Sequence, residues 1–198
     1  MSARSEILGR VHAALLGAPA PPPVGRSATG APVTRETLTL FVERVGDYRA
    51  TVERCPRREV ESRIAKALGQ RHAVVPEGLG YDVPQAIVDT VGKPLTAAEL
   101  DAIGAVVTRA TVAIAETGTI VLDHGPGQGR RAISLLPDLH VCVVEEAQVV
   151  VDVPDAVACL DPARPQTWIS GPSATSDIEL SRVEGVHGPR NLHVLLVG

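Results

Sequence analysis

Residues 140–144 read His-Val-Cys-Val-Val and residues 192–197 read Leu-His-Val-Leu-Leu-Val, and these two runs decide the fold. Their apolar residues stand at consecutive positions, which is typical of strands that are buried on both faces of a sheet. Shorter runs of the same kind occupy residues 104–107, 119–122 and 167–170. Because helical patterns lie between these runs, the sequence predicts an open α/β sheet with helices packed on both faces.

The remaining pattern predicts where helices begin and end. Thr34 is a suitable N-cap for a helix that ends near residue 46, and Pro56 can open a helix that ends before Gly69. Thr96 and Glu99 form a capping box for a third helix. We also expect strands at 50–53 and 72–75, helical stretches at 109–115 and 154–160, and short helices near residues 87–88 and after Ser176.

The N-terminal segment differs from the rest of the chain. Residues 3–16 have the spacing of an amphipathic helix, and residues 17–32 are rich in Pro, Gly and Ala. Proline lacks the amide hydrogen that regular structure needs, so this stretch predicts an extended linker. We therefore expect a tethered helix over 1–33 and an α/β domain over 34–198; the helix could fold back on the body or associate with a partner.

Composition excludes several classes of protein. The 198 residues are 44% hydrophobic and 21% charged, unlike a disordered chain, and no stretch approaches the roughly 18 apolar residues of a membrane span. A formal charge of −4 and only four aromatic residues argue against nucleic-acid binding. Since the N-terminus has no apolar signal-peptide core, we expect a cytoplasmic protein that binds no membrane.

Cysteine and histidine spacing argues against a metal site. The chain has three scattered cysteines, so neither a disulfide framework nor a structural zinc site is indicated, and an iron–sulfur cluster usually takes four thiolates. The histidines show neither H-x₃-H nor H-E-x-x-H spacing. We expect no metal and no resident cofactor.

Two loops in the middle of the chain could carry chemistry. Residues 115–119 read Ala-Glu-Thr-Gly-Thr, so that Glu116 could act as a base or nucleophile beside the hydroxyls of Thr117 and Thr119 and the flexible backbone of Gly118. Residues 124–131 form a glycine-rich loop that ends in two arginines, and Arg131 could bind a carboxylate or phosphate. Both loops could equally be plain connections, because the dinucleotide and P-loop glycine spacings are absent.

Two later loops give the sharper signal. Gly171, Pro172 and Ser173 follow a predicted strand, and Thr175 and Asp177 lead into a predicted helix start, which is a natural place for an anion. His187 and Gly188 lie in a loop before the last strand, where an imidazole could bind an anion or shuttle a proton. The alternatives without a ligand are that residues 171–177 only cap a helix and that His187 only forms a hydrogen bond with the backbone. We predict Glu116, Asp177 and His187 as catalytic and the other named loop residues as ligand-binding.

The motifs A-E-T-G-T at 115–119, S-L-L-P at 134–137, G-P-S-x-T-x-D-I-E at 171–179 and G-V-H-G-P at 185–189 occur here in a fixed order. Together they resemble the LUD (lactate-utilization) domain family, and in particular its short, single-domain members. The resemblance implies a Rossmann-like fold, similar to the ribose-phosphate isomerase and CoA-transferase group. It also implies membership of a three-protein system that oxidises L-lactate to pyruvate, in which iron–sulfur partner proteins carry the electrons.

Three functions remain open on the sequence. The leading one is a non-redox component of that lactate system, binding a small anionic ligand at strand-end loops, since this chain lacks the ferredoxin-like cysteine motifs of longer family members. The alternative is an independent enzyme that acts on a phosphorylated or CoA-linked metabolite. The third is a scaffold that recruits partners, or forms a homo-oligomer, through the N-terminal helix. Fold alone cannot choose among them.

Overall fold

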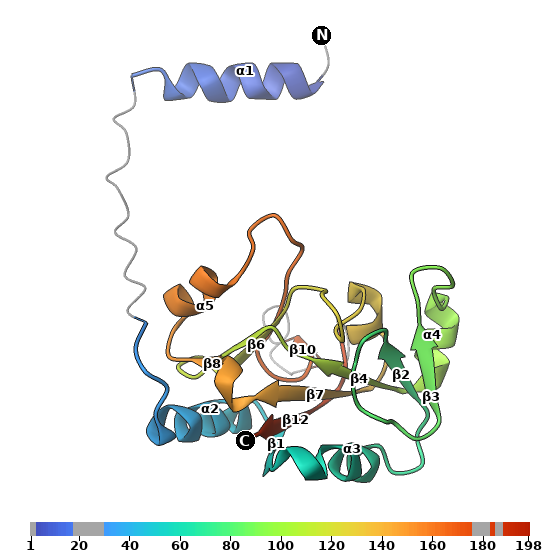
Figure 1. Cartoon of the computed structure of the whole chain (residues 1–198). Helices are drawn as coiled ribbons and strands as arrows, with labels where there is room; N and C mark the ends of the chain where they lie inside the picture. The colour runs from blue at the N-terminus through green and yellow to red at the C-terminus, as the bar shows by residue number, and fades with distance from the viewer. Residues whose placement is uncertain (1–2, 18–29, 176–182, 185–187) are drawn as a thin grey trace.

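The computed structural model describes residues 3–17, 30–175, 183–184 and 188–198. Its centre is a parallel sheet whose six strands, all within these residues, follow the order β1-β12-β7-β4-β2-β3 (Figure 1). The strands are β1 (Thr51–Cys55), β2 (Ala73–Pro76), β3 (Ala86–Asp89), β4 (Ala105–Arg109), β7 (Leu139–Glu145) and β12 (Asn191–Val197). The two runs that decided the fold are neighbours in its middle, with His140 opposite Leu192.

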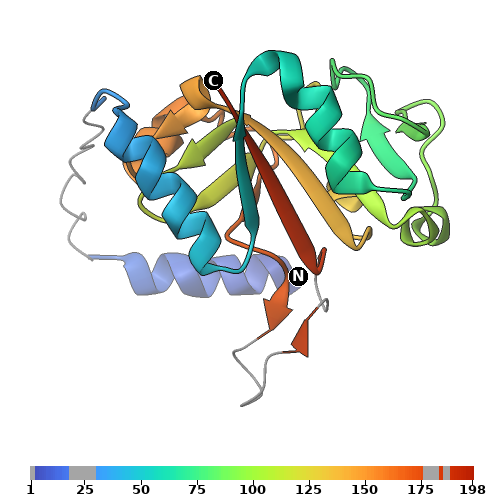
Figure 2. The same ribbon diagram turned by 90° about the horizontal axis from the view of Figure 1, so that it is seen from below.

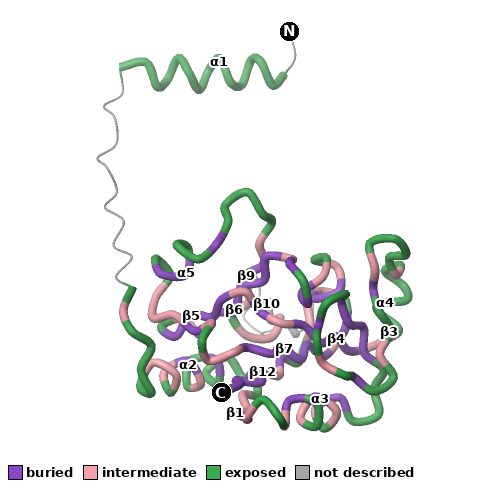
Figure 3. Tube along the Cα trace, in the orientation of Figure 1, coloured by how far each residue is buried: buried purple, intermediate pink, exposed green. Residues whose placement is uncertain are grey.

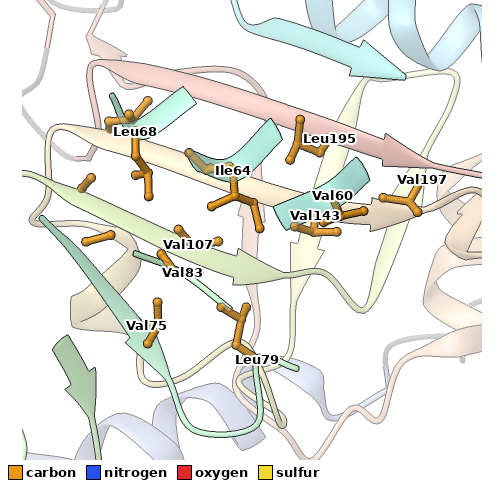
Figure 4. Close-up of a cluster of buried hydrophobic side chains, with 14 of the residues drawn as sticks. Val60, Ile64, Leu68, Val75, Leu79, Val83, Val107, Val143, Leu195 and Val197 are labelled. Atoms are coloured by element: carbon orange, nitrogen blue, oxygen red, sulfur yellow. The ribbon is translucent and has the colours of Figure 1, made fainter. Parts of the chain in front are cut away.

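One face of the parallel sheet is covered by helix α3 (Val60–Leu68), which follows the 3₁₀ helix η1 (Arg57–Glu59). Figure 4 shows Val60, Ile64 and Leu68 of this helix packed over side chains of the strands. The strand residues beneath them have odd numbers, including Val107, Val143, Leu195 and Val197. Successive side chains of a strand point to opposite faces, so the even-numbered residues form the other face.

The other face is covered by two helices and a second sheet. Phe41 and Val45 of α2 (Arg35–Asp47) are fully buried in a cluster with Val194 and Leu196. At the far end of the sheet, Leu100 of α4 (Ala97–Ile103) packs with residues of β2 and β4. Figure 2 shows α2 and α3 on either side of β1. Helices therefore cover both faces, as a Rossmann-like open α/β sheet requires.

The second sheet has four strands in the order β8-β5-β6-β9 within the described chain. They are β5 (Val112–Ile114), β6 (Thr119–Leu122), β8 (Val149–Val150) and β9 (Thr167–Ile169). The pairs of β6 with β5 and β9 are antiparallel. The other described elements are α1 (Ala3–Leu15), η2 (Arg131–Ser134), η3 (Glu146–Gln148), α5 (Val153–Cys159), β10 (Ala174–Thr175) and β11 (Val183–Glu184).

Several predicted helix ends are confirmed by the hydrogen bonds at the caps. The hydroxyl of Thr34 accepts a hydrogen bond from the amide of Thr37, and Thr96 and Glu99 form the predicted capping box. Helix α1 covers the predicted range, but none of its residues is buried, as the green tube of Figure 3 shows. The division of the chain at residue 33 stays a prediction.

Two predictions about secondary structure were wrong. Residues 109–115 form the end of β4 and strand β5 instead of a helix, because Val112–Ile114 is fully buried between β6 and β8. Residues 87–88 belong to β3, which pairs with β2. The strands predicted at 119–122 and 167–170 are confirmed as β6 and β9, but they belong to the second sheet instead of the parallel one. In each case long-range pairing decides what a short apolar run becomes. The helix expected after Ser176 lies outside the described residues.

Candidate functional site

A cavity of about 310 Å³ lies between η2, the beginnings of β7 and β12, and the segment that follows β9. We call it the first cavity. Three of its sides are polar: Arg131 and Ser134 in η2, His140 in β7, and Ser170 and Ser173 after β9. The residues that complete its wall are Leu135, Thr167, Trp168, Ile169, Gly171, Pro172, Gly188, Pro189 and Leu192. A volume of this size suits a small organic ligand.

Residues 171–173 and 188–189 meet at this cavity, although 14 residues lie between these two segments along the chain. The amide of Ser173 donates a hydrogen bond of 2.8 Å to the carbonyl of Pro189. Gly171 has a φ of +87°, and a Cβ atom there would lie 2.4 Å from Cβ of Tyr48. Only glycine fits this position without strain, so the turn after β9 is held close to the end of α2.

Arg131 supplies the positive charge at the first cavity. It begins η2, where its carbonyl accepts a hydrogen bond of 3.1 Å from the hydroxyl of Ser134. No acidic side chain in the described part of the chain pairs with the Arg131 guanidinium, which is exposed. A guanidinium without a carboxylate partner keeps its donors for an incoming anion.

His140 lies in the wall of the same cavity and is only 1% exposed. Its Nε2 atom is 2.8 Å from Oγ1 of Thr108 on the neighbouring strand. Burial lowers the pKa of the His140 imidazole to about 4, so the ring is neutral at neutral pH. Burial also raises the pKa of the neighbouring Cys142 thiol to about 12, which leaves that thiol protonated and unreactive.

The Ala-Glu-Thr-Gly-Thr loop at 115–119 packs against a helix instead of forming the catalytic site that its composition suggests. Residues 115–118 connect β5 to β6, and Glu116 is exposed there while its amide bonds to the carbonyl of Val151. Gly118 has a φ of +62°, and a Cβ atom there would lie 2.7 Å from the carbonyl carbon of Arg44 in α2. This glycine therefore lets the turn pack directly against the helix backbone.

The loop at 115–119 is linked to the first cavity by a chain of hydroxyl hydrogen bonds. The hydroxyl of Thr117 donates to the hydroxyl of Thr119 over 2.8 Å, and Thr119 is in turn 2.8 Å from the hydroxyl of Ser170 in the cavity wall. Thr119 is buried, so it supports Ser170 from behind rather than facing the cavity. This chain of hydroxyls holds the second sheet against the turn after β9.

The structure thus brings some of the predicted site residues together and separates others. Five of them line the first cavity: Arg131, Gly171, Pro172, Ser173 and Gly188. Thr117 and Thr119 act only through Ser170, while Glu116 and Gly118 are absent from its wall. Thr175 lies in β10, which pairs with β11. Asp177 and His187 fall outside the described residues.

The sequence reasoning missed His140, Trp168 and Ser170 as members of the site. A signal for His140 was present, because an imidazole inside an aliphatic strand must be desolvated and therefore needs a polar partner. The position of the cavity was also unexpected. Ligands of open α/β sheets usually bind beyond the carboxyl ends of the strands, but His140 and Leu192 are the second residues of β7 and β12, so this cavity borders their amino ends.

Two further findings concern metals and membranes. In residues 3–17, 30–175, 183–184 and 188–198, no group of three or more His, Cys, Asp or Glu side chains is arranged to hold a metal ion. Likewise, no helix in the described structure combines the length and apolar character that crossing a bilayer requires.

An open α/β domain with a second sheet and a polar cavity defines the class of this chain. Comparison with known proteins places it more closely. The model of the LUD domain matches residues 82–197. The chain belongs to the LUD domain family.

Relatives of known name support the assignment. Lactate utilization protein C of Deinococcus radiodurans is 46% identical, over 99% of this chain and 96% of that protein. A lactate utilization protein C of Bacillus pumilus is 39% identical over 42% of this chain and 38% of its own length. The crystal structure of a DUF162 family protein from Deinococcus radiodurans superposes with a TM-score of 0.69 at 39% identity, covering 89% of this chain and all of that one.

Proposed function

We propose that this chain is the non-redox component of a lactate-utilization system and that it binds a small carboxylate ligand in the first cavity. The system oxidises L-lactate to pyruvate, and iron–sulfur proteins that associate with this chain carry the electrons. The observation that carries the proposal is the 46% identity with a lactate utilization protein C over nearly the whole of both chains. The assignment to oxidation and to a three-protein system rests on the family resemblance.

The chemistry of the cavity supports a carboxylate ligand. Arg131 offers a planar fork of donors that matches the two oxygens of a carboxylate, and it has no acidic partner among the described residues. The neutral imidazole of His140 and the hydroxyls of Ser134 and Ser170 add no competing negative charge. Leu135 and Leu192 supply an apolar surface for a short alkyl group.

The cysteines support placing the electron carriers on partner proteins. Cys55 and Cys142 are buried, Cys159 is exposed, and all three are free. Three separated thiols are fewer than the four that an iron–sulfur cluster usually takes.

Binding can be tested with the intrinsic fluorescence of the chain. Trp168 is its single tryptophan and lies in the wall of the first cavity, 41% exposed. Titration of the purified full-length protein with L-lactate or pyruvate should change this fluorescence saturably. Arg131→Gln should weaken binding about tenfold, because it removes a charge-assisted hydrogen bond worth about 1.4 kcal/mol or more.

Glu116→Gln is the matched control, since it removes a charge from an exposed turn that does not line the cavity. Its affinity should equal that of the wild type. Fluorescence that stays constant with both acids, or equal affinity of the Arg131 variant and the control, would contradict the binding proposal.

The biological part of the proposal needs a separate test. A strain that lacks the gene should grow poorly on L-lactate as sole carbon source, and the wild-type gene should restore growth. Tagged protein from the complemented strain should co-purify with iron–sulfur proteins. Normal growth of the deletion strain, without a second copy of the gene, would refute the assignment to lactate utilization.

A further inference from the structure

A second cavity, of about 560 Å³, lies on the other side of the glycine-rich loop. Glu77 directly follows β2, and Asp89 ends β3, so this cavity borders the carboxyl ends of two parallel strands. Arg130 and Arg164 also line it. In open α/β sheets the crevice beyond the carboxyl ends of the strands is the usual place for a ligand.

A thin wall separates the two cavities. Arg130 and Arg131 are consecutive residues, yet Arg130 lines the second cavity and Arg131 lines the first cavity. His124 lines the second cavity, and its Nε2 atom is 3.0 Å from Oγ1 of Thr167, which lines the first. The glycine-rich loop therefore has one arginine on each side, so the two cavities can hold different molecules.

Arg130 is held in place by a buried carboxylate. Its Nε and Nη2 atoms donate to the two oxygens of Asp89 over 2.8 and 3.0 Å. Asp89 also accepts a bond of 2.8 Å from the amide of Leu95. Burial alone would raise the pKa of the Asp89 carboxyl, but the bonds from Arg130 and Leu95 outweigh it and lower that pKa. Nη1 of Arg130 makes no bond to the described residues and is left for a ligand.

Arg164 is oriented in a similar way from another element. Its Nη1 atom lies 2.8 Å from Oδ2 of Asp123, which is 8% exposed. Oδ1 of Asp123 is occupied by the hydroxyl of Thr111 at 2.8 Å and by the amide of Gly125 at 3.1 Å. A Cβ atom on Gly125 would lie 3.1 Å from Nη2 of Arg164, so the glycine makes room for the guanidinium.

We propose that the second cavity binds a phosphate monoester whose phosphate is held by Arg130 and Arg164. Two guanidinium groups that converge on one space offer more donors than a single carboxylate can accept, whereas a phosphate presents three oxygens. The paired carboxylates fix the arginines in advance, so little side-chain freedom is lost on binding. The exposed carboxylate of Glu77 can accept hydrogen bonds from hydroxyl groups on the carbon part of the ester.

The test is a calorimetric titration of the full-length protein with glycerol 3-phosphate. Binding should saturate at millimolar concentration or below, and Arg164→Gln should weaken it about tenfold, the effect of losing about 1.4 kcal/mol. Arg71→Gln is the matched control, because Arg71 is exposed and precedes the amino end of β2, whereas the second cavity lies at the carboxyl end of that strand. Its affinity should equal that of the wild type.

A second variant removes no charge. Gly125→Ala introduces a Cβ atom 3.0 Å from Oδ1 of Asp123 and 3.1 Å from Nη2 of Arg164, both at the ends of side chains, so it should displace the ion pair that orients the guanidinium by a few tenths of an ångström while the chain still folds. It should also weaken binding of glycerol 3-phosphate. Circular dichroism of each variant verifies folding.

The two cavities are distinguished by Trp168 and Arg131. Glycerol 3-phosphate should leave the tryptophan fluorescence nearly unchanged, and Arg131→Gln should bind it as the wild type does. Three results would overturn the proposal: no saturable binding, equal affinity of the Arg164 variant and its control, or loss of binding in the Arg131 variant. None of these results bears on lactate or pyruvate in the first cavity.

Discussion

Two turns of this molecule have nearly the same composition and different roles. Residues 116–119 and 170–173 both combine a glycine at positive φ with hydroxyl side chains, and both glycines pack against the end of α2 or the residue after it. The first turn is a hairpin that fills space against the helix backbone. The second borders a cavity. The comparison shows that a glycine–hydroxyl turn indicates close packing first, and a ligand only where the tertiary structure leaves room beside it.

The largest expected effect is that of Gly118→Ala in the first turn. The substitution combines a strained positive φ with a Cβ atom 2.7 Å from a backbone carbon of α2, and neither backbone can move easily. We expect the free energy of unfolding in urea to fall by about 4 kcal/mol. Affinity of the folded variant for ligands of the first cavity should not change. A loss of affinity at unchanged stability would reverse the roles assigned to the two turns.

The neutral imidazole of His140, in the wall of the cavity beside the second turn, should make the stability of the protein depend on pH, which is the next largest effect. Burial lowers the pKa of His140 to about 4 from an unfolded value near 6.5, so the unfolded chain binds more protons between these values. Its contribution to stability is complete above pH 6.5 and is lost as the pH falls toward 4. The loss approaches about 3 kcal/mol.

His140→Gln tests this contribution because it removes the titrating group. Unfolding in urea should be followed between pH 7 and about 4, the range in which His140 titrates. The variant should lose less stability than the wild type over that range. His193, whose pKa is also lowered by burial, remains in both proteins and cancels in the difference. Parallel curves for the two proteins would show that His140 is not buried as described.

Gly171→Ala in the second turn has the smallest expected effect on stability. Its Cβ atom would lie 2.4 Å from Cβ of Tyr48, so the turn after β9 must shift away from the end of α2 in addition to adopting a strained φ. We expect a loss of about 2 to 3 kcal/mol. Because the turn lines the first cavity, the fluorescence titration with L-lactate should show weaker binding. If this variant bound L-lactate as tightly as the wild type, the claim that the second turn forms a ligand site while the first only packs would be refuted.

Much of the fold could be predicted from sequence. The consecutive apolar residues of β7 and β12 identified the buried middle strands, and the caps at Thr34 and Thr96 were found from local hydrogen-bonding chemistry. The failures share a cause. Strands β5 and β3 were expected to be helical, and their partners β6 and β2 decide their structure; length alone is not the reason, because the equally short β9 was predicted correctly.

The candidate site was predictable only in part, for a similar reason. Arg131, Ser173 and Gly188 were found because charge, small size and hydroxyl groups are visible in any loop. His140 was missed, since its role depends on Thr108 of a neighbouring strand and on a cavity at the amino ends of β7 and β12. Glu116 shows the opposite case, a conspicuous residue that the fold places on an exposed turn.

The sequence alone was enough to predict an open α/β sheet, its central strands, its capped helices and its membership of the LUD domain family. Hydrophobic periodicity, helix capping and ordered motifs are properties of residues close together in the chain, so they can be read without the structure. Tertiary structure alone decided that the strands divide into two sheets, that Arg130 and Arg131 face separate cavities, and that one glycine turn packs while the other borders a hollow. Those outcomes depend on which segments, distant in the sequence, pack against each other. The free energy gained by burying their surfaces together cannot be read from either segment alone.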